Sequence, residues 1–212
     1  MIDLHTHSFF SDGVLVPSEL VRRAEHKGLT AIGITDHGDL SNLDFIIPRI
    51  VAVAEQLNQV LAIRVIPGIE LTHVPPAHIA IAAAKARELG AELVIVHGET
   101  LVEPVAPGTN HAALLSDIDI LAHPGLIDES DVILAREKNI LLEITARKGH
   151  SLSNGYVAAL AKACGASMVI NTDSHAPGDL IDADFALKVV KGAGLKEEDF
   201  QLMQENASRF VR

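Results

Sequence analysis

Short aliphatic runs alternate with segments of helical pattern along the chain. The runs are nearly continuous in Ile, Leu, Val and Ala, which is typical of parallel strands covered on both faces. Seven of them predict strands, at residues 2–4, 30–35, 62–71, 92–96, 119–122, 140–145 and 167–171. The segments between predict a helix from Pro17 that Gly28 closes, and helices at residues 43–59, 77–89, 110–115, 131–138, 155–163, 180–191 and 197–211.

Repeated strand-helix units predict a parallel sheet with right-handed crossovers. Seven strands suit either a closed barrel or an open doubly wound sheet. Polar residues with catalytic potential follow almost every strand instead of gathering at one switch point, and this favours the ring geometry of a barrel. With no internal linker in the sequence, we expect an α/β fold, a TIM-like barrel of seven β/α units, forming a single domain over residues 1–212.

A pair of histidines, His5 and His7, ends the first aliphatic run. Side chains two apart on an extended segment point the same way. Two neutral imidazoles gain little from each other, so a metal ion explains the pairing. Similar residues follow the later strands, and together the candidate ligands are His5, His7, Asp12, His37, Glu70, His97, His123, Asp173 and His175.

Nine such residues at matching positions predict a multi-metal site. Glu70 is suited to bridge two ions. Asp12 could instead cap a turn before Gly13. Asp36 is expected to fix an imidazole rather than to bind metal, and Asn110 to cap a helix.

The bulk composition limits the possible functions. The net charge is -11 and aromatic residues make up 3% of the chain, which argues against a general nucleic-acid-binding role. An anionic substrate stays compatible, because bound divalent ions can reverse the local charge. Cys164 is the single cysteine, so no intrachain disulfide can form. Neither a signal peptide nor an apolar run of ~20 residues is present, and we expect a cytoplasmic protein without membrane contact.

The motifs HTH, SDG, ITDH, GIE, VHG, AHPG and NTDSH occur in this order. From residue 3 to about residue 180 the chain resembles the polymerase-and-histidinol-phosphatase (PHP) family of metal-dependent phosphoesterases. The resemblance implies a distorted seven-stranded β/α barrel that holds two or three divalent ions of zinc, manganese or iron. It implies His5, His7, Glu70 and Asp173 for a first ion, Glu70, His97 and His123 for a second, and Asp12, His37 and His175 for a third.

A charge count is consistent with this chemistry. Three divalent ions carry six positive charges, and three carboxylates with one bridging hydroxide remove four, which leaves about two to attract a phosphate dianion. The expected reaction is hydrolysis of a small phosphomonoester by a hydroxide held between two ions. Turnover is expected to depend on Glu70, Asp173 and His175.

Basic residues on later loops are candidates for binding the substrate phosphate. Arg147 and Lys148 follow the sixth strand, and His111 lies near the preceding rim loop. A guanidinium or ammonium there can bind a phosphate oxygen that the metals leave free. A solvated basic loop is the alternative.

Other functions predict different features. A phosphodiesterase or nucleotide phosphatase would use the same ligands. A non-catalytic subunit of an RNA-processing complex should lose ligands and gain basic surface, and the chain does neither. Amide hydrolases with similar barrels usually carry a lysine at a strand end, and none is evident here. The expected partner is a small phosphorylated substrate, with no extended nucleic acid, and the sequence leaves the oligomeric state open.

Overall fold

A parallel sheet that nearly closes into a barrel forms the centre of the molecule. The computed structural model describes residues 1–211, and the sheet follows the order β1-β2-β4-β5-β6-β7-β8. These strands are β1 (Ile2–Asp3), β2 (Ala31–Ile34), β4 (Arg64–Leu71), β5 (Leu93–His97), β6 (Ile120–Ala122), β7 (Leu141–Thr145) and β8 (Met168–Asn171). Each pairs with its neighbour in parallel. The predicted barrel of seven β/α units is confirmed.

The barrel is distorted where its first and last strands meet. The segments that follow β1 and β8 are joined by an isolated parallel bridge between Thr6 and Ser174. Leu4 N also donates to Asn171 Oδ1 at 2.9 Å. This seam brings the segment after β1 beside the segment after β8, although the two lie at opposite ends of the sequence.

One strand was not predicted. The aliphatic run at residues 30–35 ends as a strand at Ile34, and a second short strand, β3 (His37–Gly38), follows it. β3 pairs with the end of β4 and places His37 opposite Glu70. The break therefore carries His37 to the carboxyl end of the barrel.

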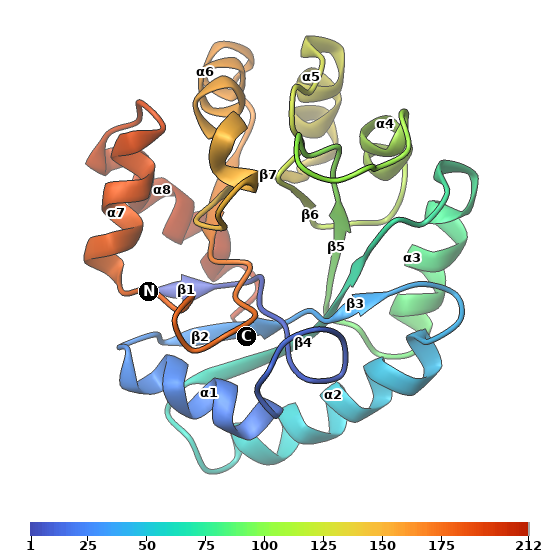
Figure 1. Ribbon diagram of the computed structural model, residues 1–212, viewed down its shortest axis with the longest axis vertical. Helices are drawn as coiled ribbons and strands as arrows, with labels where there is room; N and C mark the ends of the chain where they lie inside the picture. The colour runs from blue at the N-terminus through green and yellow to red at the C-terminus, as the bar shows by residue number, and fades with distance from the viewer. Residues whose placement is uncertain (212) are drawn as a thin grey trace.

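Helices surround the strands on the outside (Figure 1). They are α1 (Pro17–His26), α2 (Leu43–Asn58), α3 (Ile79–Glu88), α4 (Thr109–Leu114), α5 (Glu129–Lys138), α6 (Asn154–Cys164), α7 (Ala183–Gly192) and α8 (Glu197–Ser208), with 3-10 turns η1 (Pro76–His78) and η2 (His150–Ser153). All the predicted helices are present. The helix expected from residue 180 begins three residues later, because Leu180 and Ile181 are buried before it and Asp182 caps it by accepting from Phe185 N at 2.9 Å.

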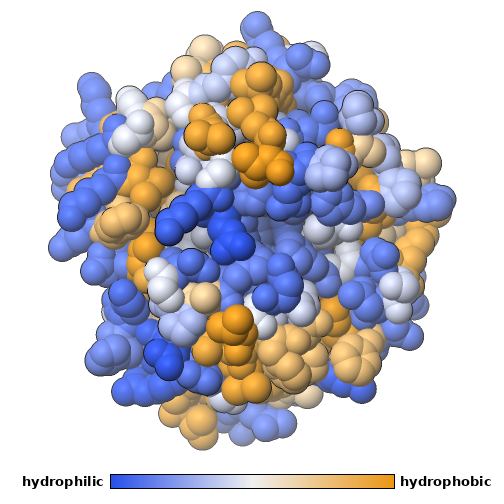
Figure 2. Space-filling model, viewed as in Figure 1, coloured by the Kyte–Doolittle hydropathy of each residue, from blue (hydrophilic) through white to orange (hydrophobic). Residues whose placement is uncertain are grey.

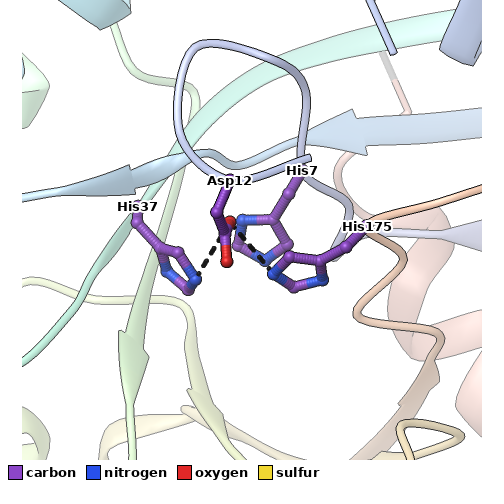
Figure 3. Close-up of side chains that lie close together, drawn as sticks. All are labelled: His7, Asp12, His37 and His175. Atoms are coloured by element: carbon purple, nitrogen blue, oxygen red, sulfur yellow. Dashed lines mark ion pairs between the residues drawn. The ribbon is translucent and has the colours of Figure 1, made fainter. Parts of the chain in front are cut away.

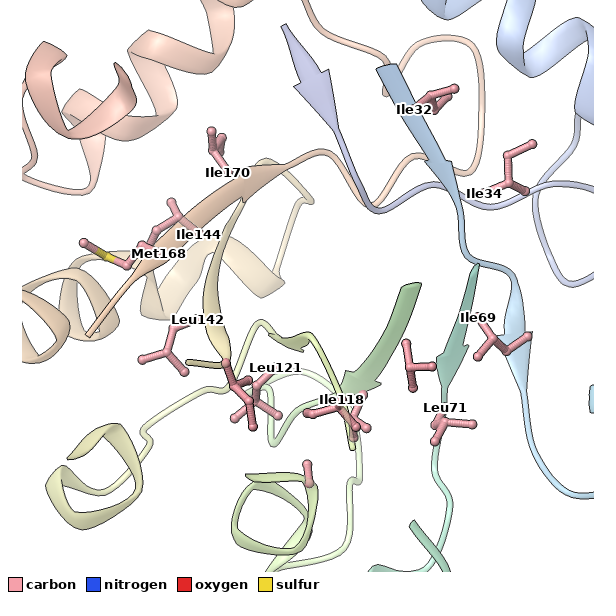
Figure 4. Packing of buried hydrophobic residues seen from close by; sticks show 14 of the residues in the cluster. Ile32, Ile34, Ile69, Leu71, Ile118, Leu121, Leu142, Ile144, Met168 and Ile170 are labelled. Atoms are coloured by element: carbon pink, nitrogen blue, oxygen red, sulfur yellow. The ribbon is translucent and has the colours of Figure 1, made fainter. Parts of the chain in front are cut away.

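Two aliphatic clusters hold this arrangement together. The larger lies between strands and helices and includes Ile32, Ile69 and Ile170 (Figure 4). The smaller includes Leu4, Leu93 and other residues of the strands. Side chains of one strand thus pack in both clusters, as the near-continuous aliphatic runs require.

The last helix, α8, closes the amino-terminal side of the barrel. Its Ala207 belongs to the smaller cluster, and Phe210 packs against the same cluster. Gln204 accepts from Ile2 N at 2.7 Å. The carboxyl ends of the strands are left for the functional residues. Among the described helices, none has the length and apolar character that crossing a membrane requires.

Candidate metal centre

His5 and His7 lie on the extended segment just beyond β1. Thr6 between them points the other way and donates its hydroxyl to Gly33 O at 2.6 Å. Both imidazoles are buried. Their ring centroids are 5.1 Å apart, with 55° between the ring planes. The alternation predicted from the sequence therefore brings the two rings together.

Glu70, near the end of β4, lies among four imidazoles. Its Oε1 is 3.4 Å from His5 Nε2 and 3.7 Å from His123 Nε2. Its Oε2 is 2.7 Å from His37 Nδ1 and 3.7 Å from His7 Nε2. The two oxygens face different histidines, which is the arrangement that a carboxylate needs in order to bridge two ions.

Asp173 approaches the same group from the segment after β8. Its Oδ1 is 3.1 Å from His7 Nε2, and its Oδ2 is 3.6 Å from His123 Nε2. Asp173 has φ of +51° and His123 has φ of +28°, in a region that non-glycine residues seldom adopt. Backbone strain at both candidate ligands is a feature often found at functional sites.

Asp12, His37 and His175 form the outer part of the cluster (Figure 3). Asp12 Oδ1 is 3.4 Å from His37 Nε2 and 3.1 Å from His175 Nε2. These three residues and His7 each offer a ligand atom, all within 4.8 Å of one another. The Asp12 side chain is 56% exposed, so this group borders solvent. A hollow lined by hydrophilic side chains lies near the centre of the face shown in Figure 2.

His97 ends β5 and lies beside His123. Their ring centroids are 4.4 Å apart and the planes are nearly perpendicular, at 71°. His150 joins them, and the three offer nitrogen atoms within 4.8 Å of one another. The structure thus brings together all nine residues that the sequence predicted as metal ligands.

The residues fit divalent ions on a structural criterion. Several buried polar atoms of the cluster have no hydrogen-bond partner among the described residues, namely His5 Nε2, His7 Nδ1, His7 Nε2, Glu70 Oε1, His123 Nδ1 and Asp173 Oδ1. Leaving such atoms unsatisfied costs roughly 1–3 kcal/mol each. Imidazole nitrogens and carboxylate oxygens are the usual ligands of zinc, iron and manganese. Cations among them would satisfy most of these atoms.

Burial controls the charge of the inner imidazoles. It lowers the pKa of His7 well below the ordinary value, and the neighbouring His37 adds to the effect. Burial and His97 do the same to the pKa of His123. Both rings are therefore neutral, which is the form that binds a metal ion. At His37 burial again opposes the charge, but the carboxylates of Glu70 and Asp12 outweigh it and raise the pKa to about 10.

The sequence profile of the PHP domain matches residues 3–147. The chain belongs to the PHP domain family. The family resemblance inferred from the motifs is thereby confirmed.

Related sequences and structures agree with this membership. An uncharacterised protein of Methanocaldococcus jannaschii is 52% identical over 94% of the chain and 92% of its own length. A protein of Shewanella pealeana named "probable phosphatase" is 28% identical over 91% of the chain and 84% of its own length. A chain in the structure of an archaeal ribonuclease P with mature tRNA has a TM-score of 0.73 at 18% identity, over 99% of this chain and 89% of that one. At this identity the structural likeness shows the fold alone.

Glu143 is a buried carboxylate of this PHP domain to which the sequence analysis gave no role. It lies in β7, and its Oε1 is 2.8 Å from His5 Nδ1. Asn171 Nδ2 donates to the same oxygen at 2.9 Å, and His123 N donates to Oε2 at 3.2 Å. Glu143 therefore fixes His5 with Nδ1 toward the carboxylate and Nε2 toward the cluster. The signal in the sequence was a charged residue inside an aliphatic strand.

The predicted role of Asp36 was wrong. Within residues 1–211, its carboxylate makes no hydrogen bond or ion pair with an imidazole. It accepts hydrogen bonds from the backbone N and the hydroxyl of Ser8, and from the same groups of Ser11. Asp36 therefore shapes the loop that carries Asp12, and it acts on the site through that loop.

The candidate phosphate-binding residues lie to one side of the centre. Arg147 Nη1 is 3.3 Å from Asp179 Oδ2, and the same oxygen accepts from the backbone N of His175 at 3.0 Å. Arg147 is thus connected to the loop of a candidate ligand. Arg147 and Lys148 both line a cavity of about 770 Å³ that continues along α7.

His111, the third phosphate-binding candidate, and Asn110, the expected helix cap, both have structural contacts. His111 on α4 is 60% exposed, with Nδ1 2.6 Å from Asp131 Oδ1, and no described contact joins it to the cluster. Asn110 was expected to cap its helix, and it does not. It lies inside α4, where its Oδ1 accepts from Glu99 N at 3.0 Å and its Nδ2 donates to Pro124 O at 2.9 Å. Asn110 thereby ties together the loops that follow β5 and β6.

Proposed function

We propose that this PHP domain is a metal-dependent phosphoesterase that hydrolyses a small phosphomonoester at a centre of three divalent ions. The convergence of nine ligand-type side chains, with several buried atoms lacking partners, is the observation that carries the proposal. The phosphatase name of the Shewanella relative supports the same reaction.

The ring planes are compatible with a division of the histidines among three ions. The lone pair of an imidazole nitrogen lies in the plane of the ring, so the inclination of two rings bears on whether both direct a nitrogen to one ion. The stacked pairs are His7 with His175 at 23°, and His5 with His123 at 27°. The pairs inclined more steeply are His5 with His7 at 55°, His97 with His123 at 71° and His37 with His175 at 48°.

This division gives each ion two histidines and at least one carboxylate. His5 and His7 go with Glu70 and Asp173. His97 and His123 would bind a second ion, and Glu70 would belong to both the first and the second group. His37, His175 and Asp12 would bind the third ion. The family resemblance implies the same grouping, and the inclined pairs are compatible with it.

The chain's own residues prepare this centre for phosphate chemistry. Divalent ions would lower the pKa of a water molecule and neutralise negative charge on the transferring phosphoryl group. Glu70 fixes the spacing between two ligand groups. Asp173 and His175, whose Oδ1 and Nδ1 atoms are 3.4 Å apart, would contribute to turnover as metal ligands. Arg147 is the candidate for holding a phosphate oxygen from the cavity side.

Two other functions remain as outcomes of the test. A phosphodiesterase would use the same centre on a substrate with one negative charge fewer. A non-catalytic subunit of an RNA-processing complex has the likeness to the ribonuclease P chain in its favour. The complete ligand set and the net charge of -11 favour an enzyme.

A comparison of two chromogenic esters tests the proposal. Protein freed of metal with a chelator is reconstituted with manganese or zinc and assayed on p-nitrophenyl phosphate and on bis-p-nitrophenyl phosphate. We expect metal-dependent turnover, faster on the monoester. Faster turnover of the diester would make the protein a phosphodiesterase. Turnover that is unchanged by complete removal of metal, or no turnover of either ester with metal bound, would contradict the proposal.

A further inference from the structure

A fourth carboxylate, besides those of Glu70, Asp12 and Asp173, reaches the mouth of the barrel from the loop after β5. Glu103 lies on this loop, and its side chain is 38% exposed. Its Oε2 is 3.2 Å from His97 Nε2 and 3.1 Å from His73 Nε2, and its Oε1 is 3.4 Å from His150 Nε2. One carboxylate thus faces three imidazoles, one at the end of β5 and two from the loops after β4 and β7.

The contact between Glu103 and His97 requires either a proton on Nε2 or a metal ion between the two groups. His97 Nδ1 is 3.1 Å from Gly98 O, and a carbonyl oxygen can only accept, so Nδ1 carries the proton. In the neutral ring Nε2 then carries a lone pair, which faces a carboxylate oxygen at 3.2 Å. Two ligand atoms bound to one ion at ~2.1 Å are about 3.0–3.4 Å apart. The distance suits two ligands of one ion, and a cation removes the repulsion between them.

The outer histidines are placed to hold the carboxylate. His73 stacks on His97 with 29° between the planes, and His150 stacks on His123 with 16°. Each outer ring directs Nε2 to a different oxygen of Glu103.

The surroundings of both outer rings indicate that they are fixed in place. Thr100 Oγ1 lies 2.7 Å from His150 Nδ1 and holds that ring, which is 6% exposed. His73 has φ of +53°, the same unusual backbone region as His123 and Asp173. The cost of such a conformation, of order 1–3 kcal/mol, is typical of positions under functional constraint.

We propose that Glu103 is a further ligand of the ion held by His97 and His123, and that His73 and His150 are positioning residues for its carboxylate. The inference rests on the proposed function, because it concerns one ion of that centre. It adds a ligand from an exposed loop to a set that otherwise comes from buried strand ends.

Metal titration of variants tests the role of Glu103. Metal-free protein is titrated with Co²⁺, and the visible absorption of the bound ion reports both affinity and ligand set. Glu103→Gln is expected to weaken one class of ion by at least about tenfold and to change its spectrum. The matched control is Glu99→Gln on the same loop, because Glu99 Oε1 accepts from Asn110 N at 2.9 Å and a glutamine oxygen keeps that bond.

The positioning residues have their own signature. His73→Ala and His150→Ala are each expected to weaken the same class of ion and to shift its spectrum. In double variants that also carry Glu103→Gln, neither substitution should weaken ion binding further, because both residues act through that carboxylate.

The outcomes separate this inference from the proposed function. If Glu103→Gln binds all ions with the affinity and spectrum of the wild type, Glu103 is not a ligand. Glu103→Asp keeps the charge on a shorter side chain, so it gives the same test should Glu103→Gln not fold. If the wild-type protein binds no Co²⁺, the proposed function itself fails.

Discussion

Glu70 shows how one residue can hold a whole centre together. Its two oxygens lie within 3.7 Å of nitrogen atoms of His5, His7, His37 and His123. The nearby imidazoles His5 and His37 keep the pKa of this carboxyl well below its usual range, although burial opposes the charge. Glu70 is therefore ionised and able to bridge ions.

Replacing Glu70 with alanine is predicted to abolish turnover, because the variant loses the bridge between two ligand groups. A loss of at least about a thousandfold is expected for a bridge that both positions and neutralises. Assays of phosphate release with saturating metal measure it. His26→Ala, at the exposed end of α1, is the control and should leave turnover nearly unchanged. Near-normal turnover of Glu70→Ala would refute the assignment of the ions.

Glu143 acts on the centre through His5. Glu143→Gln keeps the size of the side chain but removes the negative charge beside His5 Nδ1. It also places an amide donor near the donors of Asn171 and His123. We predict metal binding about 10–100-fold weaker, as is typical when a partner of a ligating histidine is lost. Calorimetric titration with Zn²⁺ measures the change. Glu137→Gln, on the exposed surface of α5, should bind as the wild type does, and unchanged binding by Glu143→Gln would contradict this role.

At the scale of elements, the strand ends decide which residues meet. Parallel strands share one direction, so side chains that follow different strands reach the same mouth. This rule made the nine candidate ligands predictable from aliphatic runs and the residues after them. It gave no information about loops, because a loop's path depends on contacts with other loops. Glu103, His73 and His150 meet in that way, and no pattern in the sequence connects them.

The anchoring of α8 gives a prediction about stability. Asp199 Oδ2 accepts from Lys196 N at 2.9 Å at the start of this helix, and Oδ1 accepts from Lys162 Nζ at 2.5 Å. The bond from Lys162, followed by that from Lys196, lowers the pKa of Asp199. Asp199→Asn is predicted to reduce the free energy of unfolding by about 1 kcal/mol at pH 7.

The pH dependence of this effect has a definite sign. A carboxyl whose pKa is lower in the folded state stabilises the protein above its unfolded pKa, and the contribution is lost as the pH falls through the folded pKa. The difference between wild type and Asp199→Asn should therefore shrink below about pH 3.8. Urea unfolding at several pH values measures it, with the exposed Glu205→Gln of the same helix as control. An unchanging difference would rule out the charged cap as its cause.

For the whole molecule, the alternation of strands and helices was predictable, but its irregularities were not. The interruption at Thr35 and Asp36 that creates β3 follows from hydrogen bonds of Asp36 to Ser8 and Ser11. Such contacts join residues far apart in the sequence and leave no periodic signal. The same holds for the seam between β1 and β8.

Removal of metal is predicted to destabilise the whole barrel. The centre joins segments from both ends of the chain, and ions that bind the folded state add about 2.7 kcal/mol at a hundredfold excess over the dissociation constant. For a chain of this size that corresponds to a melting temperature about 5–10 °C lower after chelation. Calorimetry with and without chelator measures the shift. Glu70→Ala should show a much smaller shift, and an equal one would place the stabilising ions elsewhere.

Anomalous scattering from crystals grown with manganese or zinc tests the central claim most directly. We predict three peaks at the mouth of the barrel. One should lie between His5 and His7, one between His97 and His123, and one between His37 and His175. Glu70 should touch the first two. An absence of peaks at these positions, or peaks bound by other residues, would contradict the metal centre on which the proposed function depends.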